Sequence, residues 1–130
     1  MIAITHLTST TGIQFPARDI AGLARKRGIW MHLDGAQTFG AFDVNLQDIG
    51  PDSYSTSAHK WLMGPLEAGL LYIRGERIAK LWPSIVTAGW TENLKGARKF
   101  EVFGQRDDPR VAALESALDF VTLIGMPAVE

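Results

Sequence analysis

Short apolar runs, each followed by a cluster of polar residues, recur along the chain. Runs this short with few polar interruptions are typical of strands that are buried on both faces. Such runs predict strands, the third weaker than the others, at residues 2–7, 29–33, 53–57 and 68–73.

Helical periodicity separates the first two runs. Ile20, Leu23 and Ala24 recur at helical spacing and predict a helix over residues 18–27, with Gly28 placed to end it. Further along, residues 76–81 predict a short helix. Residues 82–106 hold several Gly and Pro with few periodic runs, and this composition predicts a long loop or crossing segment.

A longer helix is predicted near the end of the chain. Asp108 is placed to cap it, and Pro109 stands at its first position, where proline is favoured. Gly125 and Pro127 are placed to stop it. Its apolar stripe consists of Val111, Leu114, Leu118 and Val121.

Alternating strands and helices favour one fold class. The pattern predicts an α/β protein with three layers, in which helices cover a mostly parallel sheet. In such sheets a ligand binds beyond the carboxyl ends of the strands. Polar clusters follow successive predicted strands at residues 8–11, 34–37 and 57–60, and we expect them to converge on one site.

Composition removes several classes of function. The 130 residues suit one domain, and 13 basic and 14 acidic residues without a basic block argue against a nucleic-acid partner. The absence of cysteine excludes disulfides, thiolate zinc sites and thiol nucleophiles within this stretch. No apolar run reaches membrane-spanning length, so no membrane partner is expected. The start lacks the pattern of a signal peptide, which favours a cytoplasmic location unless the true start lies upstream.

The polar clusters contain the groups that pyridoxal 5'-phosphate (PLP) requires. That cofactor needs a lysine for a Schiff base, a carboxylate to keep its pyridine nitrogen protonated, and donors for its phosphate. Lys60 can supply the amine, and Asp34 can supply the carboxylate at a strand end. Gln37 offers an amide donor for the ring oxygen, and Ser57 and His59 offer phosphate donors beside the lysine.

Each of these residues also has an ordinary interpretation. A single lysine is usually a solvated charge, and an isolated Asp-Gly is usually a turn. The three histidines belong to three different predicted strands or the turn after one, without the spacing of metal ligands, so they predict packing or phosphate contacts and no metal site: His6, His32 and His59. The tryptophans predict core or interface anchors: Trp61, Trp82 and Trp90.

Two motifs at a fixed separation carry a more specific signal. The stretch Leu33–Gly40, LDGAQTFG, followed by Ser57–Pro65, SAHKWLMGP, resembles the class V aminotransferase family. The similarity extends to Thr5–Gly12 and to Phe100-Glu101 with Gly104. It implies a PLP-dependent enzyme with the aspartate-aminotransferase-like fold (fold type I), closest to the isopenicillin N epimerase-like branch.

The resemblance also assigns roles to individual residues. It implies that Lys60 forms the Schiff base and shuttles the proton at the α-carbon of an amino-acid substrate. Asp34 would pair with the pyridinium nitrogen, and Gln37 would contact the ring oxygen. The remaining implied contacts are those of Ser57 and His59 with the phosphate and of Ser9 with the ring.

The chain departs from the family pattern at two positions. Glu67 stands where relatives often have glycine, so it would be strained if that position needs a positive φ. Gln105 replaces a threonine that in relatives reaches the phosphate of the neighbouring subunit.

Family members are about three times this length, beyond the size of one domain. Residues 1–106 would form the C-terminal part of the large PLP-binding domain, and residues 107–130 the start of the helix that leads to a small domain. The predicted strands would be contiguous in a larger sheet, and we expect a truncated piece of a homodimeric enzyme. Two functions follow: an aminotransferase or epimerase-like enzyme that acts through Lys60, or an inactive remnant that serves as an interaction or dimerisation module.

Overall fold

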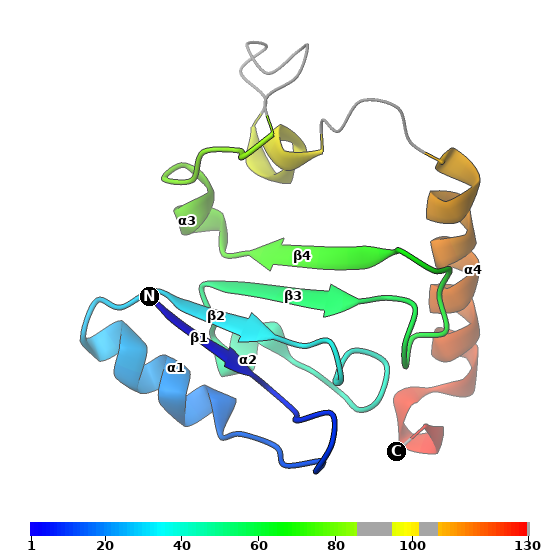
Figure 1. The fold of residues 1–130 in the computed structure, drawn as a ribbon, viewed down its shortest axis with the longest axis horizontal. Coiled ribbons are helices and arrows are strands. Elements are labelled where there is room, and N and C mark those ends of the chain that lie inside the picture. The colour runs from blue at the N-terminus through cyan, green and yellow to red at the C-terminus, as the bar shows by residue number, and fades with distance from the viewer. Residues whose placement is uncertain (86–94, 102–106, 130) are drawn as a thin grey trace.

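The computed structural model describes residues 1–85, 95–101 and 107–129. Within them, one sheet has the order β1-β2-β3-β4 (Figure 1). The strands are β1 (Ile2–Thr5), β2 (Met31–Asp34), β3 (Ser53–Ser57) and β4 (Gly69–Ile73). Each lies within two residues of its predicted ends, and the α/β fold class is confirmed.

The helices are α1 (Ala17–Lys26), α2 (Leu46–Ile49), α3 (Gly75–Ile78) and α4 (Asp108–Ile124), with short 3₁₀ helices η2 (Gly96–Phe100) and η3 (Met126–Ala128). No described helix is long and apolar enough to cross a membrane. The pattern missed α2, a single turn that Asn45 caps by accepting a hydrogen bond from Asp48 N. The predicted loop contains η2, and its residues 86–94 and 102–106 lie outside the described part of the chain.

The direction of the strands places their ends. β1 and β2 are parallel, as are β2 and β3, with Thr5 paired to Asp34 and Asp34 paired to Ser55. β4 is antiparallel to β3, because residues 58–68 form no helix and a parallel return needs a crossover of about a dozen residues or more. The carboxyl ends of β1, β2 and β3 therefore share one edge of the sheet (Figure 1).

Helix α1 covers one face of the sheet. Small side chains line the buried side of the helix and allow it to approach the strands closely, at Ala17, Ala21 and Ala24. They pack against a core that includes Met31, Leu33 and Tyr54. The helix that Ile20, Leu23 and Ala24 predicted is present, but Leu23 itself is 52% exposed.

Alternation along the strands makes the other face mostly polar over β1, β2 and β3. Successive side chains of a strand point to opposite faces, so every second residue shares a face. On the face opposite the α1 core lie Thr5, His32, Asp34, Ser53, Ser55 and Ser57. This polar face runs toward the same edge at which the parallel strands end.

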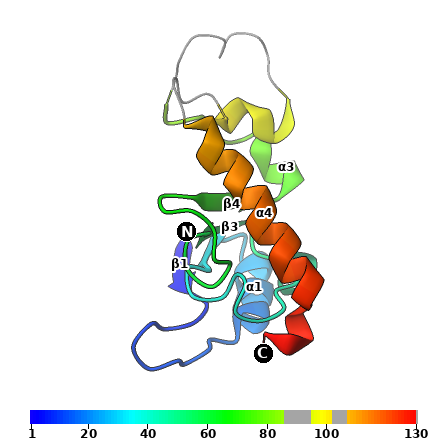
Figure 2. The ribbon, with the colours of Figure 1, turned by 90° about the vertical axis from the view of Figure 1, so that its right-hand side faces the viewer.

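Helix α4 stands beyond the ends of β2 and β3 (Figures 1 and 2). Its Val121 packs with Ala58 and Leu62 from the turn after β3. The predicted stripe is partly wrong: Val111 and Leu118 are exposed, and the buried positions are Ala117 and Val121. The predicted start is also one residue late, since the N-cap is Asp107 and its side chain makes no capping bond.

Candidate functional site

Polar turns from three strands meet at the carboxyl edge of the sheet, as the sequence predicts. Thr5 and Asp34 are register partners, so the turns after β1 and β2 begin side by side. The turn after β3 joins them through Trp61, whose indole Nε1 donates to Gln37 Oε1 at 3.1 Å. This hydrogen bond between two turns was not expected, because sequence spacing does not reveal it.

The turn after β2 is fixed against β3 by backbone and hydroxyl contacts. Gly35 is buried, its N–H donates to Ser55 O at 2.8 Å, and its carbonyl accepts from Thr56 Oγ1 at 2.8 Å. Thr38 Oγ1 donates to the same carbonyl at 3.1 Å. Asp34 itself is exposed, and its Oδ1 accepts from Ala36 N at 2.9 Å. The carboxylate is therefore held in a rigid turn that faces solvent.

The turn that carries Lys60 is fixed by a buried residue on each side of it. Ala58 and Leu62 are 0% and 2% exposed and pack against α4. Gly64 N donates to Ala58 O at 2.8 Å, and Met63 N donates to Lys60 O at 3.0 Å, which closes the turn. The residues between Ala58 and Leu62 are exposed: His59, Lys60 and Trp61. Trp61 is thus not a core residue.

Backbone strain lies just beyond this turn. Glu67 has φ +65°, so the condition under which this residue would be strained is met. Its carboxylate pairs with Arg110 Nη1 at 2.9 Å, which ties the loop to the first turn of α4. Met63 has φ +60°, a second strained position that sequence reasoning missed. Gln105 lies outside the described residues.

The other predicted residues, Ser57, Ser9 and Trp82, occupy different positions in the structure. Ser57 is the last residue of β3 and lies on the polar face. Ser9 is exposed in the turn after β1, and within the described part of the chain no hydrogen bond joins it to the other predicted residues. Trp82 is 69% exposed, so it is not a core anchor either, and Trp90 lies outside the described residues.

The histidines occupy three different environments. His6 is buried and makes an edge-to-face contact with Phe42, with ring centroids 5.6 Å apart. His32 bridges Ser53 and Ser55. In the described residues, no group of three or more His, Asp or Glu could hold a metal ion.

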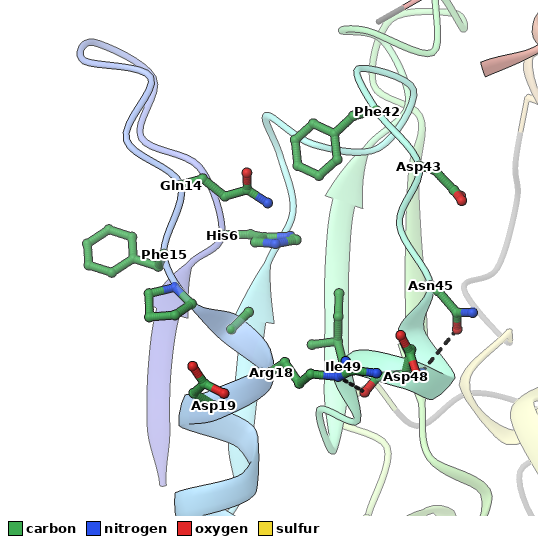
Figure 3. Close-up of a pocket in the computed structure, with 12 residues that line it drawn as sticks. His6, Gln14, Phe15, Arg18, Asp19, Phe42, Asp43, Asn45, Asp48 and Ile49 are labelled. Carbon is green, nitrogen blue, oxygen red and sulfur yellow. Dashed lines mark hydrogen bonds and ion pairs between the residues drawn. The ribbon is translucent and has the colours of Figure 1, made fainter. Parts of the chain in front are cut away.

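A cavity of about 490 Å³ opens beside the end of β1, on the side of the sheet that α1 covers (Figure 3). Its lining includes His6, Phe15, Arg18, Phe42, Asn45 and Asp48. None of the six predicted site residues contributes to it. The cavity is therefore separate from the edge that presents Asp34 and Lys60.

His6 gives the fold a dependence on pH. Burial lowers the pKa of the His6 imidazole, and its Nδ1 has no partner among the described residues. Because unfolded His6 takes up a proton more readily than folded His6, the unfolding free energy falls as the pH drops below about 6.5, by at most ~1.4 kcal/mol per pH unit. Urea denaturation between pH 8 and pH 5 measures this slope.

His6→Leu should flatten the slope, because it removes the buried imidazole. An equal slope in wild type and His6→Leu would show that other groups control the acid response.

Comparisons with known proteins match nearly the whole chain to one family. The family model for aminotransferase class-V matches residues 1–130. The chain is 32% identical over 96% of its length to an isopenicillin N epimerase from Streptomyces clavuligerus, and covers 35% of that protein. It is 31% identical over 97% of its length to a cysteine desulfurase from Salmonella newport, and covers 33% of that protein.

Solved structures show the same fold. The apo cysteine desulfurase from Thermococcus onnurineus NA1 superposes on 96% of this chain with a TM-score of 0.86 and 24% identity, and the chain covers 33% of it. The cysteine desulfurase CsdA from Escherichia coli gives a TM-score of 0.86 at 22% identity, over 97% of this chain and 33% of that one. The chain thus spans about a third of the length of the relatives it matches.

Proposed function

The chain belongs to the aminotransferase class-V family, and we propose that it forms the cofactor-binding part of a PLP enzyme that acts on an amino acid. The observation that carries the proposal is the presence of both Asp34 and Lys60 at one edge of the sheet. Both stand exposed in turns that buried residues fix, and the bond between Trp61 and Gln37 joins those turns. Relatives named as an epimerase and as desulfurases support amino-acid chemistry in general.

The donor set at this edge fits the chemistry of PLP. An ionised carboxylate suits a cationic ring nitrogen, and a primary amine suits an aldehyde carbon. Hydroxyl, imidazole and amide groups at the same edge suit a phosphate and a ring oxygen. When bound, the cofactor supplies an electron sink for the bonds of the substrate α-carbon.

Each of the predicted site residues then has a distinct role. Lys60 holds the cofactor through its amine and, once released, removes or returns the proton at the substrate α-carbon. Asp34 keeps the ring nitrogen protonated, and Gln37 donates to the ring oxygen. Ser57 and His59 bind the phosphate, and Ser9 contacts the ring.

The same proposal extends to the domain organisation. Residues 1–106 belong to a large cofactor-binding domain, and residues 107–130 begin the helix that leads toward a smaller one. The reaction is amino-group transfer or epimerisation, and the full enzyme works as a homodimer.

Chemical trapping tests the proposal. The purified chain is mixed with PLP, its visible absorbance is recorded, and borohydride then fixes any lysine adduct for peptide mapping. We expect the tag on Lys60, with loss of the absorbance band in Lys60→Ala. Lys26→Ala, which removes an exposed lysine at the end of α1, should leave the band intact.

Two outcomes would contradict the proposal. Absence of a band in wild type, or tagging spread evenly over surface lysines, would show that no specific site forms. Self-association of the chain without cofactor binding would favour the alternative, an inactive remnant that serves as a dimerisation module.

A further inference from the structure

Four side chains form a continuous hydrogen-bonded chain across β2 and β3. The indole Nε1 of Trp30 donates to Ser53 Oγ at 3.0 Å. Ser53 Oγ lies 2.9 Å from His32 Nδ1, and His32 Nε2 lies 3.1 Å from Ser55 Oγ. The proposed function uses none of these residues, although His32 and Ser55 share the polar face with Asp34.

The first donor, Trp30, sets the direction of the hydrogen-bonded chain. An indole nitrogen can only donate, so Ser53 Oγ accepts from Trp30 and its own proton is free to go to His32 Nδ1. His32 then carries its proton on Nε2 and donates to Ser55 Oγ. If His32 instead carried its proton on Nδ1, Ser53 would accept twice, and its own proton would have no acceptor in this chain. In the favoured direction the Ser55 hydroxyl is the final donor.

At its Trp30 end, the hydrogen-bonded chain is held in place by the ion pair between Arg77 and Asp52. The Arg77 guanidinium lies over the Trp30 ring, 5.5 Å from its centroid. Arg77 Nε donates to Asp52 Oδ1 at 2.7 Å, and Asp52 is buried. This contact fixes the indole, and so it fixes the first donor of the chain.

Beyond Ser55, the neighbouring residue on the same face of β2 is Asp34. Asp34 and Ser55 are register partners on neighbouring parallel strands, which lie about 5 Å apart. Asp34 Oδ1 accepts from Ala36 N, whereas in the described part of the chain Oδ2 accepts no hydrogen bond. The Ser55 hydroxyl therefore lies on the same face of the sheet as a carboxylate oxygen that has no donor among the described residues, although the structure shows no hydrogen bond between them.

We propose that Ser55 and His32 are positioning residues for Asp34: the chain from Trp30 presents the Ser55 hydroxyl proton to the Asp34 carboxylate. This inference rests on the proposed function. A hydrogen bond from a fixed hydroxyl limits the rotation of a carboxylate, so the hydrogen-bonded chain orients Asp34 toward the cofactor ring nitrogen. Neither residue touches the cofactor, and both act through Asp34.

The first test needs no cofactor. Long-range ¹H–¹⁵N NMR on the full chain at pH 8 distinguishes the two histidine tautomers. We expect His32 in the Nε2–H form, and we expect Ser53→Ala to perturb its ring nitrogens. A His32 in the Nδ1–H form would reverse the chain and overturn the inference.

The second test measures PLP binding by absorbance titration. Ser55→Ala should weaken binding about tenfold, as expected for the loss of a hydrogen bond to a charged group. Ser55→Thr keeps the hydroxyl and should restore the affinity. Ser116→Ala, at an exposed position on α4, is the matched control and should bind as wild type does. The pH dependence of the bound absorbance should change in Ser55→Ala and His32→Gln, but not in Ser116→Ala.

The outcomes separate the two proposals. If wild type binds PLP through Lys60 while Ser55→Ala binds equally well, the hydrogen-bonded chain has no positioning role and the proposed function stands. If wild type does not bind PLP, both proposals fail, whatever the tautomer of His32. Far-UV circular dichroism of each variant confirms that a loss of affinity does not reflect unfolding.

Discussion

Replacing Gly35 with alanine is expected to lower the free energy of unfolding by about 3 kcal/mol, the upper range for overpacking a core. A Cβ at this position would lie 2.0 Å from Cζ and from Oη of the Tyr54 ring. That ring is 1% exposed, and its hydroxyl lies 3.1 Å from Thr38 Oγ1. The ring cannot move aside without breaking this contact and disturbing the core under α1. Urea denaturation of the variant measures the loss.

A second glycine provides the matched control. Gly22 lies within α1, and a Cβ there meets no atom within 4 Å. Gly22→Ala should therefore stabilise the chain by about 0.5–1 kcal/mol, since alanine is the better helix former. Tyr54→Leu should also recover part of the loss in Gly35→Ala, so that the double variant is less destabilised than the sum of the single ones. A Gly35→Ala variant within about 0.5 kcal/mol of wild type would refute the steric argument.

The strands and the edge of the sheet that carries the polar clusters were predictable because they depend on short-range patterns in the sequence. Apolar runs locate strands, and polar clusters after parallel strands must share an edge. The positive φ of Glu67 was also accessible, because a residue that replaces a family glycine inherits the backbone conformation of that position.

Other features depend on contacts between distant residues, which periodicity does not encode. Three alanines line the buried side of α1, whereas Leu23 is exposed, and the spacing of apolar residues along the helix does not show which of them face the sheet. The indole of Trp61 is exposed because it reaches across to Gln37 instead of entering the core. Likewise, the chain from Trp30 to Ser55 joins residues more than 20 positions apart, and only the strand register brings them together.

Asp52 is expected to be a second position where a small change has a large effect. Its Oδ2 accepts from Met31 N at 2.9 Å, and its Oδ1 accepts from Arg77 Nε at 2.7 Å. Asp52→Ala should lower the free energy of unfolding by about 3 kcal/mol, because it leaves the buried Met31 N–H and a half-buried guanidinium without their acceptor. Denaturant unfolding at pH 7 measures this cost.

The surface pair between Asp48 and Arg18 is the matched control, because both side chains are more than half exposed. Asp48→Ala should cost less than about 1 kcal/mol. An Asp52→Ala variant that costs no more than Asp48→Ala would show that the buried network contributes little.

The dependence on pH supplies an independent check on Asp52. Burial alone would raise the pKa of the Asp52 carboxyl, but the hydrogen bonds from Met31 and Arg77 and the charges of Arg77 and Arg74 outweigh it, so the pKa is lowered. The stabilisation of the fold by Asp52 is therefore complete when the pH is above the ordinary carboxyl pKa of about 4. It is lost as the pH falls through the lowered pKa of Asp52. The difference between wild type and Asp52→Ala should stay constant from pH 8 to pH 5 and shrink below pH 4. Asp52→Asn keeps an oxygen for Met31 N–H but loses the charge, so it should lower the free energy of unfolding at pH 7 by less than Asp52→Ala does. The difference in stability between wild type and Asp52→Asn should disappear in acid.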